Sequence, residues 1–190
     1  MKTDAQITVA GIDEAGRGAW AGPVVAAALV LPKGTRLPGL KDSKQLSAQQ
    51  REKLFDQIIK SCEFGVGMAS HLEIDEFGLT KATFLAFERA LNALPRRPNA
   101  LKVDGRDPFH FDIPAEFIIR GDTKVRSISA ASVLAKVTRD RWMVEAAKTH
   151  SNHSFELHKG YGTAKHQEAL KTHGACDIHR KSYQPLKNLT

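Results

Sequence analysis

Short apolar runs alternate along the chain with stretches in which apolar residues recur every three or four positions. The runs are rich in β-branched residues and are punctuated by glycines, which is the pattern of buried or half-buried strands. The first two runs are separated by few residues, and this favours an antiparallel hairpin. The expected strands are residues 7–12, 24–31, 62–68, 100–103 and 116–119.

Two amphipathic stretches predict helices in the middle of the chain. The first helix begins after Ser47, which has capping-box spacing with Gln50. The second covers residues 80–94 and ends before Pro95. The residues expected to face the core are Leu54, Phe55, Ile58 and Ile59 in the first helix, and Phe84, Leu85, Ala90 and Leu91 in the second.

A longer helix is expected over residues 129–148, followed by one or two shorter helices and an irregular tail over residues 150–190. Strands come first along the chain and are then mixed with helices. The pattern therefore predicts an α/β fold in which helices pack on a mixed sheet. A length of 190 residues suits one domain, residues 1–190, with the C-terminal helices as an extension packed on it.

The composition is that of a folded protein, with 42% hydrophobic and 26% charged residues. Cys62 and Cys176 need no disulfide in a chain of this length and fit a reducing compartment. No secretory leader is evident, and the longest apolar stretch, residues 19–31, is interrupted by Gly22 and Pro23 and is too short to span a bilayer. We therefore expect a cytoplasmic, monomeric protein that does not enter membranes.

Acidic residues stand out against a net charge of +7, which itself indicates a polyanionic partner such as nucleic acid. Asp13 and Glu14 follow the first predicted strand, Asp104 follows the fourth and Asp122 the fifth. Carboxylates gathered at one edge of a sheet repel one another unless a cation neutralises them, and Mg²⁺ or Mn²⁺ takes oxygen ligands. The four acids therefore predict a divalent-metal site suited to phosphodiester hydrolysis.

Each acid taken alone also has a structural explanation, because Asp at a strand end is a common turn former and Asp104 precedes a glycine. Asp13 and Glu14 are harder to explain by packing, since burying two charges in an apolar stretch costs free energy. Neighbouring residues in a regular strand point to opposite faces, so these two can share a site only where the strand ends. Gly16 and Gly18 are consistent with such an end.

Three further features suit contact with a sugar-phosphate chain. Exposed amides and an arginine at Gly16, Arg17 and Gly18 could approach a backbone closely and read a 2′-hydroxyl. Tyr161 lies between two glycines and could stack on a base or sugar, or equally anchor the core. One stripe of the long helix carries hydroxyls and cations that could hold phosphates or form a solvated polar face; its members are Ser129, Ser132, Lys136 and Arg139.

Six of the eight histidines lie between His150 and His179. A zinc site would be indicated by paired cysteines or by a His-Glu-x-x-His pattern, and the sequence has neither. The pattern therefore favours packing and surface roles, with one or two phosphate contacts, for these histidines.

Five motifs, in order along the chain, resemble those of the ribonuclease HII family. They are residues 11–18 (GIDEAGRG) with 21–23 (AGP), residues 42–46 (DSKQL), residues 103–105 (VDG), residues 121–124 (GDTK) with 127–140 (SISAASVLAKVTRD), and residues 158–163 (HKGYGT) with 180–183 (RKSY). Each motif is short, but the ordered set spans nearly the whole chain. Departures from the family pattern at Ala19, Trp20, Phe77, Gly78 and Arg106 leave the four acids untouched.

The resemblance implies a ribonuclease H-like fold with a five-stranded mixed sheet and a helical C-terminal part. It implies an endonuclease that cuts the RNA of RNA–DNA hybrids and cuts 5′ to single ribonucleotides in duplex DNA, leaving 3′-hydroxyl and 5′-phosphate ends. It implies Asp13, Glu14, Asp104 and Asp122 as the catalytic set that binds Mg²⁺ or Mn²⁺. The residues implied to bind substrate are Gly16, Arg17 and Gly18 at the ribonucleotide, Tyr161 at the next deoxyribose, and Lys44, Ser129, Ser132 and Lys136 at phosphates.

Two alternatives remain at this point. A related nuclease on the same fold, such as a junction resolvase or a type 3 ribonuclease H, would differ in substrate. A type 3 enzyme should carry a further N-terminal domain, for which a first strand at residue 7 leaves no room. A nucleic-acid-binding module without chemistry would need no metal, but four acids on its binding surface would repel the phosphates.

Overall fold

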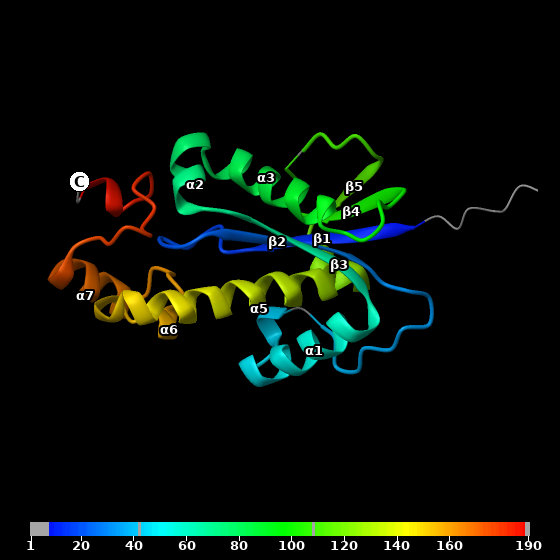
Figure 1. The fold of residues 1–190 in the computed structure, drawn as a ribbon, viewed down its shortest axis with the longest axis horizontal. Helices are drawn as coiled ribbons and strands as arrows, with labels where there is room; N and C mark the ends of the chain where they lie inside the picture. The colour runs from blue at the N-terminus through cyan, green and yellow to red at the C-terminus, as the bar shows by residue number, and fades with distance from the viewer. Residues whose placement is uncertain (1–7, 42, 108, 189–190) are drawn as a thin grey trace, which may run out of the picture.

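A five-stranded mixed sheet forms the middle layer of the molecule (Figure 1). The computed structural model describes residues 8–41, 43–107 and 109–188. The strands are β1 (Val9–Ala15), β2 (Val24–Val30), β3 (Glu63–Ala69), β4 (Ala100–Asp104) and β5 (Ala115–Ile118). Their order is β3-β2-β1-β4-β5; β2 is antiparallel to both β1 and β3, whereas β4 is parallel to both β1 and β5.

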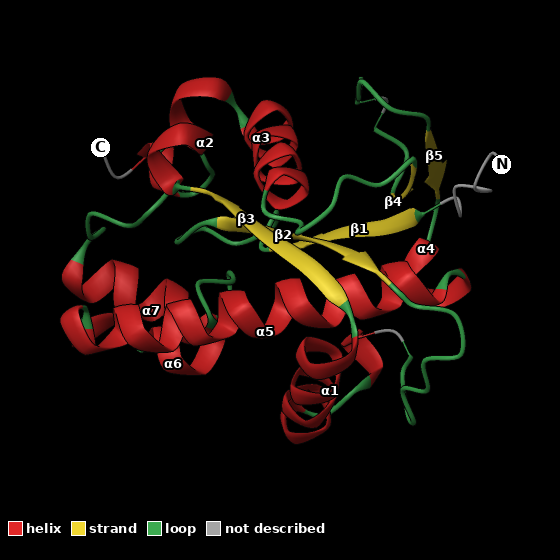
Figure 2. Ribbon diagram, turned by 45° about the vertical axis from the view of Figure 1, so that its right-hand side comes forward, coloured by secondary structure: helices red, strands yellow, loops and turns green. Residues whose placement is uncertain are grey.

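Helices cover both faces of this sheet (Figures 1 and 2). α2 (His71–Phe77) and α3 (Leu79–Asn92) lie over one face, and α1 (Ala48–Ser61) and α5 (Arg126–Thr149) lie over the other. The core accordingly has two parts, one containing Ile12, Phe87 and Val103 and the other containing Leu29, Ile58 and Leu134. None of the helices in the described part of the chain combines the length and the hydropathy needed to cross a membrane.

Short elements surround the two ends of α5. η1 (Ser43–Gln45) precedes α1, and α4 (Gly121–Lys124) precedes α5; η2 (Ser151–His153), α6 (Phe155–His158), α7 (Ala164–His173) and η3 (Leu186–Asn188) follow it. A third group of buried side chains joins the C-terminal part to the end of α5, and it includes Met143, Phe155 and Ile178. These contacts hold the C-terminal segments against the long helix.

The close approach of α5 to β1 depends on Gly11. A Cβ at this position would lie 2.4 Å from the backbone carbonyl carbon of Ser127. Only glycine therefore lets the start of α5 lie directly against the strand. This approach brings the first turns of α5 beside the strand that carries Asp13.

The five strands predicted from the sequence are all present, and β1 and β2 form the expected antiparallel hairpin. Ser47 and Gln50 form the expected capping box at the start of α1. The first strand differs in extent, because it runs on to Ala15 and so contains Asp13 and Glu14 instead of ending before them. Its predicted beginning at residue 7 lies outside the described residues.

The helix predictions need three corrections. The hydrophobic pattern misses α2, although Ser70 and Glu73 form a capping box at its start. Ile59 was expected in the core but is 38% exposed. In α3 the fully buried residues include Ala82, Ala86 and Phe87, whereas the expected Phe84, Leu85 and Leu91 are only partly buried. Small residues face the sheet there because α3 packs on two glycines of β3, Gly65 and Gly67, at which a Cβ would lie 2.2 Å from a helix carbonyl oxygen.

Candidate active site

Three carboxyl groups meet where β4 ends beside β1. Asp13 comes from β1, Asp104 is the last residue of β4, and Asp122 lies in the first turn of α4. One oxygen of each lies within 4.8 Å of the other two. β1 and β4 are parallel neighbours, so the strand pairing brings Asp13 next to Asp104. The N–H of Gly121 donates to Asp104 Oδ1 at 2.6 Å, which fixes the start of α4 against the end of the strand.

Asp13 and Asp104 line a pocket, here called the carboxylate pocket. Glu14 borders this pocket too but is outside the group of three. β1 continues beyond its last pair with β4, Ile12 with Val103, and both Asp13 and Glu14 lie in that overhang. Adjacent strand residues point to opposite faces. The end of the pairing with β4, and not the end of β1 itself, therefore lets both side chains border one pocket.

Burial and mutual repulsion set the charge state of this cluster. Asp13 is 4% exposed, and burial, followed by the charges of Glu14 and Asp104, raises the pKa of Asp13 well above its ordinary value. Burial also raises the pKa of Glu14 to about 7, against the opposing effect of Arg17. A hard divalent cation takes oxygen ligands and would relieve this repulsion. The donor set thus fits Mg²⁺ or Mn²⁺.

Glu14 should make the metal-free protein less stable as the pH rises. Its pKa of about 7 in the fold exceeds the ordinary value of 4.5, so the native state holds the proton more tightly. The stabilisation is fully present below pH 4.5 and is lost as the pH rises through 7. Between pH 4.5 and pH 8, the free energy of unfolding of the protein relative to Glu14→Gln, measured in urea with EDTA, should fall by on the order of 3 kcal/mol. A difference that does not change with pH would contradict this.

Two buried arginines hold the loop that follows β1, residues 16–18, here called the glycine loop. A Cβ on Gly16 would lie 2.0 Å from Arg139 Nε, and the φ of Gly16, +97°, also favours glycine. Arg180 Nη1 donates to the carbonyl of Arg17 at 2.9 Å, and the hydroxyl of Tyr183 donates to the same oxygen at 2.8 Å. The side chains of Arg139, Arg180 and Tyr183 therefore fix the backbone of this loop.

The outer side of the loop is open. Gly18 is exposed, and no atom lies within 4 Å of the position of a Cβ there. Arg17 Nη1 donates to Asp107 Oδ2 at 2.7 Å and is 3.6 Å from Glu14 Oε1. The arginine thus lies between the acidic pocket and the segment after β4. The sequence prediction does not include Asp107, since nothing in its spacing from Arg17 indicates that the two residues meet.

Two of the residues predicted on α5, Ser132 and Lys136, border the carboxylate pocket, whereas Ser129 lines a neighbouring pocket with Asp122. The hydroxyl of Ser132 is 2.7 Å from the hydroxyl of Ser43 in η1. Lys136 donates to Asp140 at 2.7 Å. Ser129 is 5% exposed, and its hydroxyl has no hydrogen-bond partner among the described residues. Ser43 is a pocket residue that the predicted set omits.

Arg139 does not share the exposed polar face that the spacing along α5 suggests. It is 0% exposed and its guanidinium donates to three backbone carbonyls, so its role is structural. The side chain of Lys44, predicted at a phosphate, lies outside what the structure describes.

Tyr161 borders the pocket from the C-terminal part of the chain. Lys136 Nζ and Arg139 Cζ lie 5.2 and 5.1 Å from the centre of its ring. Its backbone forms an isolated β-bridge with Ala19, just after the glycine loop, and His166 Nδ1 donates to its carbonyl at 3.0 Å. The tyrosine is therefore positioned relative to the glycine loop by backbone contacts.

Trp20 reinforces this connection. A Cβ on Gly162 would lie 2.2 Å from Trp20 Cζ2, so the indole packs on bare backbone next to Tyr161. The indole ring also lies 5.4 Å from the ring of His166, centre to centre. Trp20, a departure from the family pattern, thus packs the segment that follows the glycine loop against the backbone beside Tyr161.

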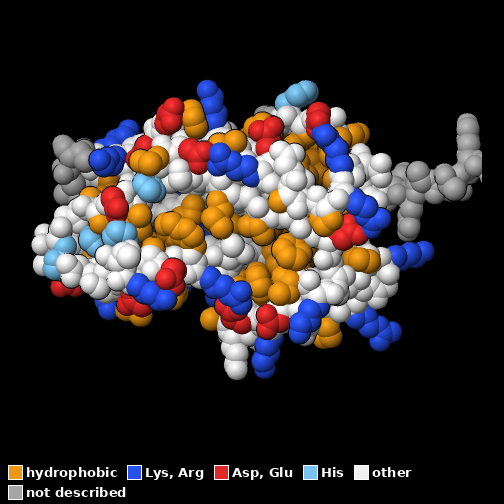
Figure 3. Space-filling view, in the orientation of Figure 1, with side chains coloured by type: hydrophobic (Ala, Val, Ile, Leu, Met, Phe, Trp, Pro, Cys, Tyr) orange, Lys and Arg blue, Asp and Glu red, His pale blue; other side chains and the backbone are white. Residues whose placement is uncertain are grey.

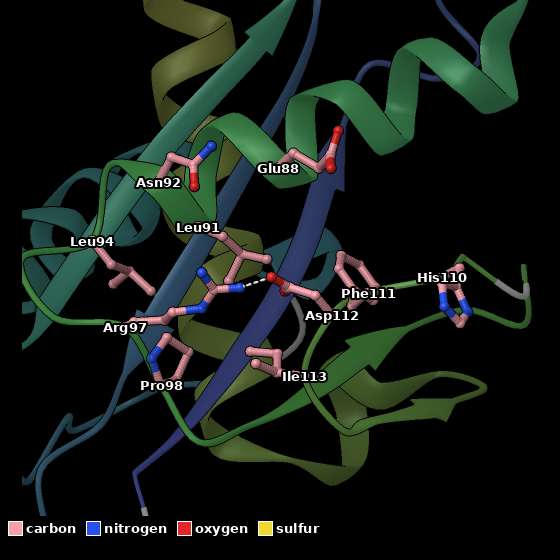
Figure 4. A pocket seen from close by; sticks show the side chains of 10 residues that line it. All are labelled: Glu88, Leu91, Asn92, Leu94, Arg97, Pro98, His110, Phe111, Asp112 and Ile113. Atoms are coloured by element: carbon pink, nitrogen blue, oxygen red, sulfur yellow. Dashed lines mark hydrogen bonds and ion pairs between the residues drawn. The ribbon is translucent and has the colours of Figure 1, made fainter.

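A second pocket lies between the end of α3 and residues 110–113 (Figure 4). Leu91, Leu94 and Ile113 contribute apolar walls, and Arg97 and Asp112 form an ion pair across it. It shares no residue with the carboxylate pocket. Of these two pockets, only the one beside β1 brings together the acids predicted from the sequence.

Comparison with known proteins gives a consistent assignment. Residues 10–186 match the family model described as ribonuclease HII. Ribonuclease HII of Paracidovorax citrulli is 50% identical over 94% of this chain and 75% of its own length, and that of Endomicrobium trichonymphae is 49% identical over 95% and 87%. Ribonuclease H2 of Pyrococcus horikoshii superposes with a TM-score of 0.79 at 30% identity, covering 96% of this chain and 97% of that one.

A more distant likeness extends the fold comparison. A ribonuclease HIII structure solved with Mn²⁺ (Bst-RNase HIII) superposes with a TM-score of 0.73 at 16% identity, over 96% of this chain and 69% of that one. The five-stranded mixed sheet flanked by helices is thus a ribonuclease H-like fold, as the resemblance implies. The chain belongs to the ribonuclease HII family and is a ribonuclease H, a hydrolase of RNA phosphodiester bonds.

Proposed function

We propose that this protein is an endonuclease that cuts the RNA strand of RNA–DNA hybrids and cuts 5′ to a single ribonucleotide in duplex DNA. The products carry 3′-hydroxyl and 5′-phosphate ends, the cofactor is Mg²⁺ or Mn²⁺, and the reaction serves to remove ribonucleotides from DNA. The observation that carries the proposal is the meeting of Asp13, Asp104 and Asp122 within 4.8 Å, next to a pocket that Asp13 and Asp104 border together with Arg17 and Tyr161.

The acids hold the metal in this proposal. Asp13 and Asp104, on neighbouring strands, would share two divalent ions, and Glu14 and Asp122 would each complete the ligands of one of them. Such ions would supply Lewis-acid stabilisation of the phosphoryl oxygens and a more acidic bound water. The side chain of Ser132 opposes the rise in the pKa of Asp13 and so favours its carboxylate form.

The glycine loop selects the ribonucleotide. Its backbone is held by Arg139 and Arg180, and its outer side is open at Gly18, so a sugar can approach its amides closely. Arg17, fixed by Asp107, lies between that surface and the acids. Groups held rigidly in this way can hydrogen bond to a 2′-hydroxyl, the one group that distinguishes the RNA sugar. Lys136, Ser129 and Lys44 hold the flanking phosphates.

Tyr161 should contribute by stacking, so its ring matters more than its hydroxyl. Tyr161→Ala should lower kcat/KM on a duplex with one ribonucleotide by about 10–100-fold, since a stacking contact in nucleic-acid binding is worth about 1–3 kcal/mol. Tyr161→Phe keeps the ring and should remain within about threefold of the unsubstituted protein. Steady-state cleavage of the labelled duplex gives both values. Equal losses in the two variants would contradict a stacking role.

The substrate proposal is tested by mapping the cuts in three labelled duplexes with Mg²⁺ or Mn²⁺ present. One is all DNA, one carries a single ribonucleotide, and one is a long RNA–DNA hybrid. The expected result is no cut in the first, one cut immediately 5′ to the ribonucleotide in the second, and several in the third, with ends that a DNA ligase can rejoin. Cleavage of the hybrid alone would overturn the single-ribonucleotide part of the proposal.

A further inference from the structure

Histidine and cysteine side chains gather where the end of α5 meets the segment after α7. Figure 3 shows histidines reaching the surface at this end of the molecule, over α7 of Figure 1. His153 lies in η2, and Cys176 and His179 lie in the segment after α7. One ligand atom of each lies within 4.8 Å of the other two, and His179 Nδ1 is 3.1 Å from Cys176 Sγ. This sulfur and imidazole set shares no residue with the carboxylate pocket.

The hydrogen bonds of His153 leave one ring nitrogen unused. The side chain is 6% exposed, and Nε2 lies 3.0 Å from the carbonyl oxygen of Gly174. A carbonyl only accepts, so the neutral ring carries its proton on Nε2 and a lone pair on Nδ1. Nδ1 is buried and has no hydrogen-bond partner among the described residues. A buried acceptor without a donor costs free energy, which indicates that something else occupies it.

His179 has the same tautomer. The backbone N–H of Cys176 donates to His179 Nδ1 at 2.9 Å, so its proton lies on Nε2, which donates to His166 Nε2 at 3.0 Å. Both rings of the cluster therefore carry the Nδ1 lone pair, in the neutral form that ligates metals. The amide of Cys176 competes for the lone pair of His179 and has to move aside when a metal binds.

We propose that His153, Cys176 and His179 bind a zinc-type divalent ion, the thiol proton being released to solvent. Sulfur with two imidazoles is a donor set that zinc prefers and that Mg²⁺ does not. Tetrahedral zinc holds such atoms about 3.3–3.7 Å apart, so Cys176 Sγ and His179 Nδ1, now 3.1 Å apart, have to separate slightly, while the remaining separations, all within 4.8 Å, have to fall in that range. A second set, His150, Cys176 and Asp177, has its ligand atoms within 4.8 Å of one another and shares the same sulfur, so the fourth ligand in this proposal is His150 or Asp177.

The ion would stabilise the wall of the active site that carries Tyr161. His179 donates to His166, and His166 in turn donates to the carbonyl of Tyr161. A metal on His179 therefore fixes the first member of a chain of contacts that ends at the tyrosine. It also adds a link between η2 and the segment after α7, which are already joined by the hydrogen bond of His153 Nε2 to the carbonyl of Gly174.

Cobalt binding tests the site directly, because a Co²⁺–thiolate bond gives a near-ultraviolet charge-transfer band that carboxylate ligands do not give. The chain has two cysteines, and these provide matched variants of the full-length protein. Adding Co²⁺ to the metal-free protein should produce the band, which should persist in Cys62→Ser and vanish in Cys176→Ser. Absence of the band in the unsubstituted protein, its survival in Cys176→Ser, or its loss in Cys62→Ser would overturn the proposal.

Thermal unfolding with Zn²⁺ provides the second readout. The Asp104→Asn background removes one acid of the carboxylate cluster, so zinc bound there contributes less. In that background Zn²⁺ at a hundredfold excess over its dissociation constant should raise Tm by about 5–10 °C. Adding Cys176→Ser to Asp104→Asn should abolish the shift. The double variant is folded if its Tm in EDTA and its circular dichroism equal those of Asp104→Asn. Equal shifts with and without Cys176 would also overturn the site.

Discussion

The Asp104→Asn variant is expected to lose RNA cleavage by about a thousandfold or more while keeping its fold and its affinity for duplex. Asparagine retains an oxygen where Asp104 accepts the N–H of Gly121, so the junction between β4 and α4 survives. It removes one of the four carboxyl groups proposed to hold the cation, and metal assistance is worth several kcal/mol of transition-state stabilisation. Single-turnover rates on a duplex with one ribonucleotide measure the loss, and fluorescence anisotropy measures the affinity.

Asp112→Asn is the matched control for this substitution. Asp112 pairs with Arg97 in the other pocket, outside the carboxylate cluster. The same loss of one charge there should leave the cleavage rate within about twofold, because long-range electrostatics at the surface are screened. Turnover by Asp104→Asn at the rate of the unsubstituted protein would show that Asp104 is not part of the catalytic set.

Replacing Arg139 by methionine should be among the most destabilising changes in the protein. The side chain is 0% exposed, and it donates from Nε to Pro23 O at 2.8 Å, from Nη1 to Lys159 O at 3.0 Å and from Nη2 to Ala21 O at 3.0 Å. Methionine fills much of the space but leaves three carbonyls without donors. We expect a loss of about 3–5 kcal/mol in the free energy of unfolding, measured in urea.

Arg141→Met provides the comparison on the same helix. Arg141 is half exposed and pairs with Glu52 at the surface, so its loss should cost less than about 1 kcal/mol. Cleavage should also fall in Arg139→Met under conditions where it remains folded, since Arg139 supports Gly16 and lies beside Tyr161. Similar stabilities for the two variants would refute the structural role of Arg139.

Local patterns were sufficient to predict most of the secondary structure. Alternation and β-branched residues mark the five strands, and the capping box at Ser47 marks α1. The buried face of α3 was predicted correctly at Ala90 but wrongly at Phe84, Leu85 and Leu91, because Gly65 and Gly67 on β3 bring the backbone of α3 close to the strand. Helix periodicity identifies the apolar residues of a helix, but it does not show how closely the helix packs on its partner strand.

Much of the candidate site could be predicted because its acids lie close to the ends of predicted strands. Asp13, Asp104 and Asp122 do meet, because β1 and β4 are paired neighbours and α4 begins beside the end of β4. The residues that position them could not be predicted. Arg139 follows a polar spacing but turns inward, since carbonyls far away in the sequence need its hydrogen bonds.

The histidine and cysteine cluster escaped the sequence interpretation for a related reason. His153 belongs to η2, whereas Cys176 and His179 follow α7, so the short spacing of Cys176 and His179 does not point to His153 as a third ligand. Only the packing of the two segments against the end of α5 brings these side chains together.

We propose that the carboxylate pocket beside β1 holds the divalent ions that RNA cleavage requires. The most direct test of this claim is single-turnover cleavage of a one-ribonucleotide duplex, first with chelator and then after adding back Mg²⁺ or Mn²⁺ in steps, with metal occupancy measured on the same samples. We expect no product in chelator, and a cleavage rate that rises with occupancy of the carboxylate site in the unsubstituted protein but not in Asp104→Asn. Cleavage that persists in chelator, or a rate that does not follow this occupancy, would contradict the claim.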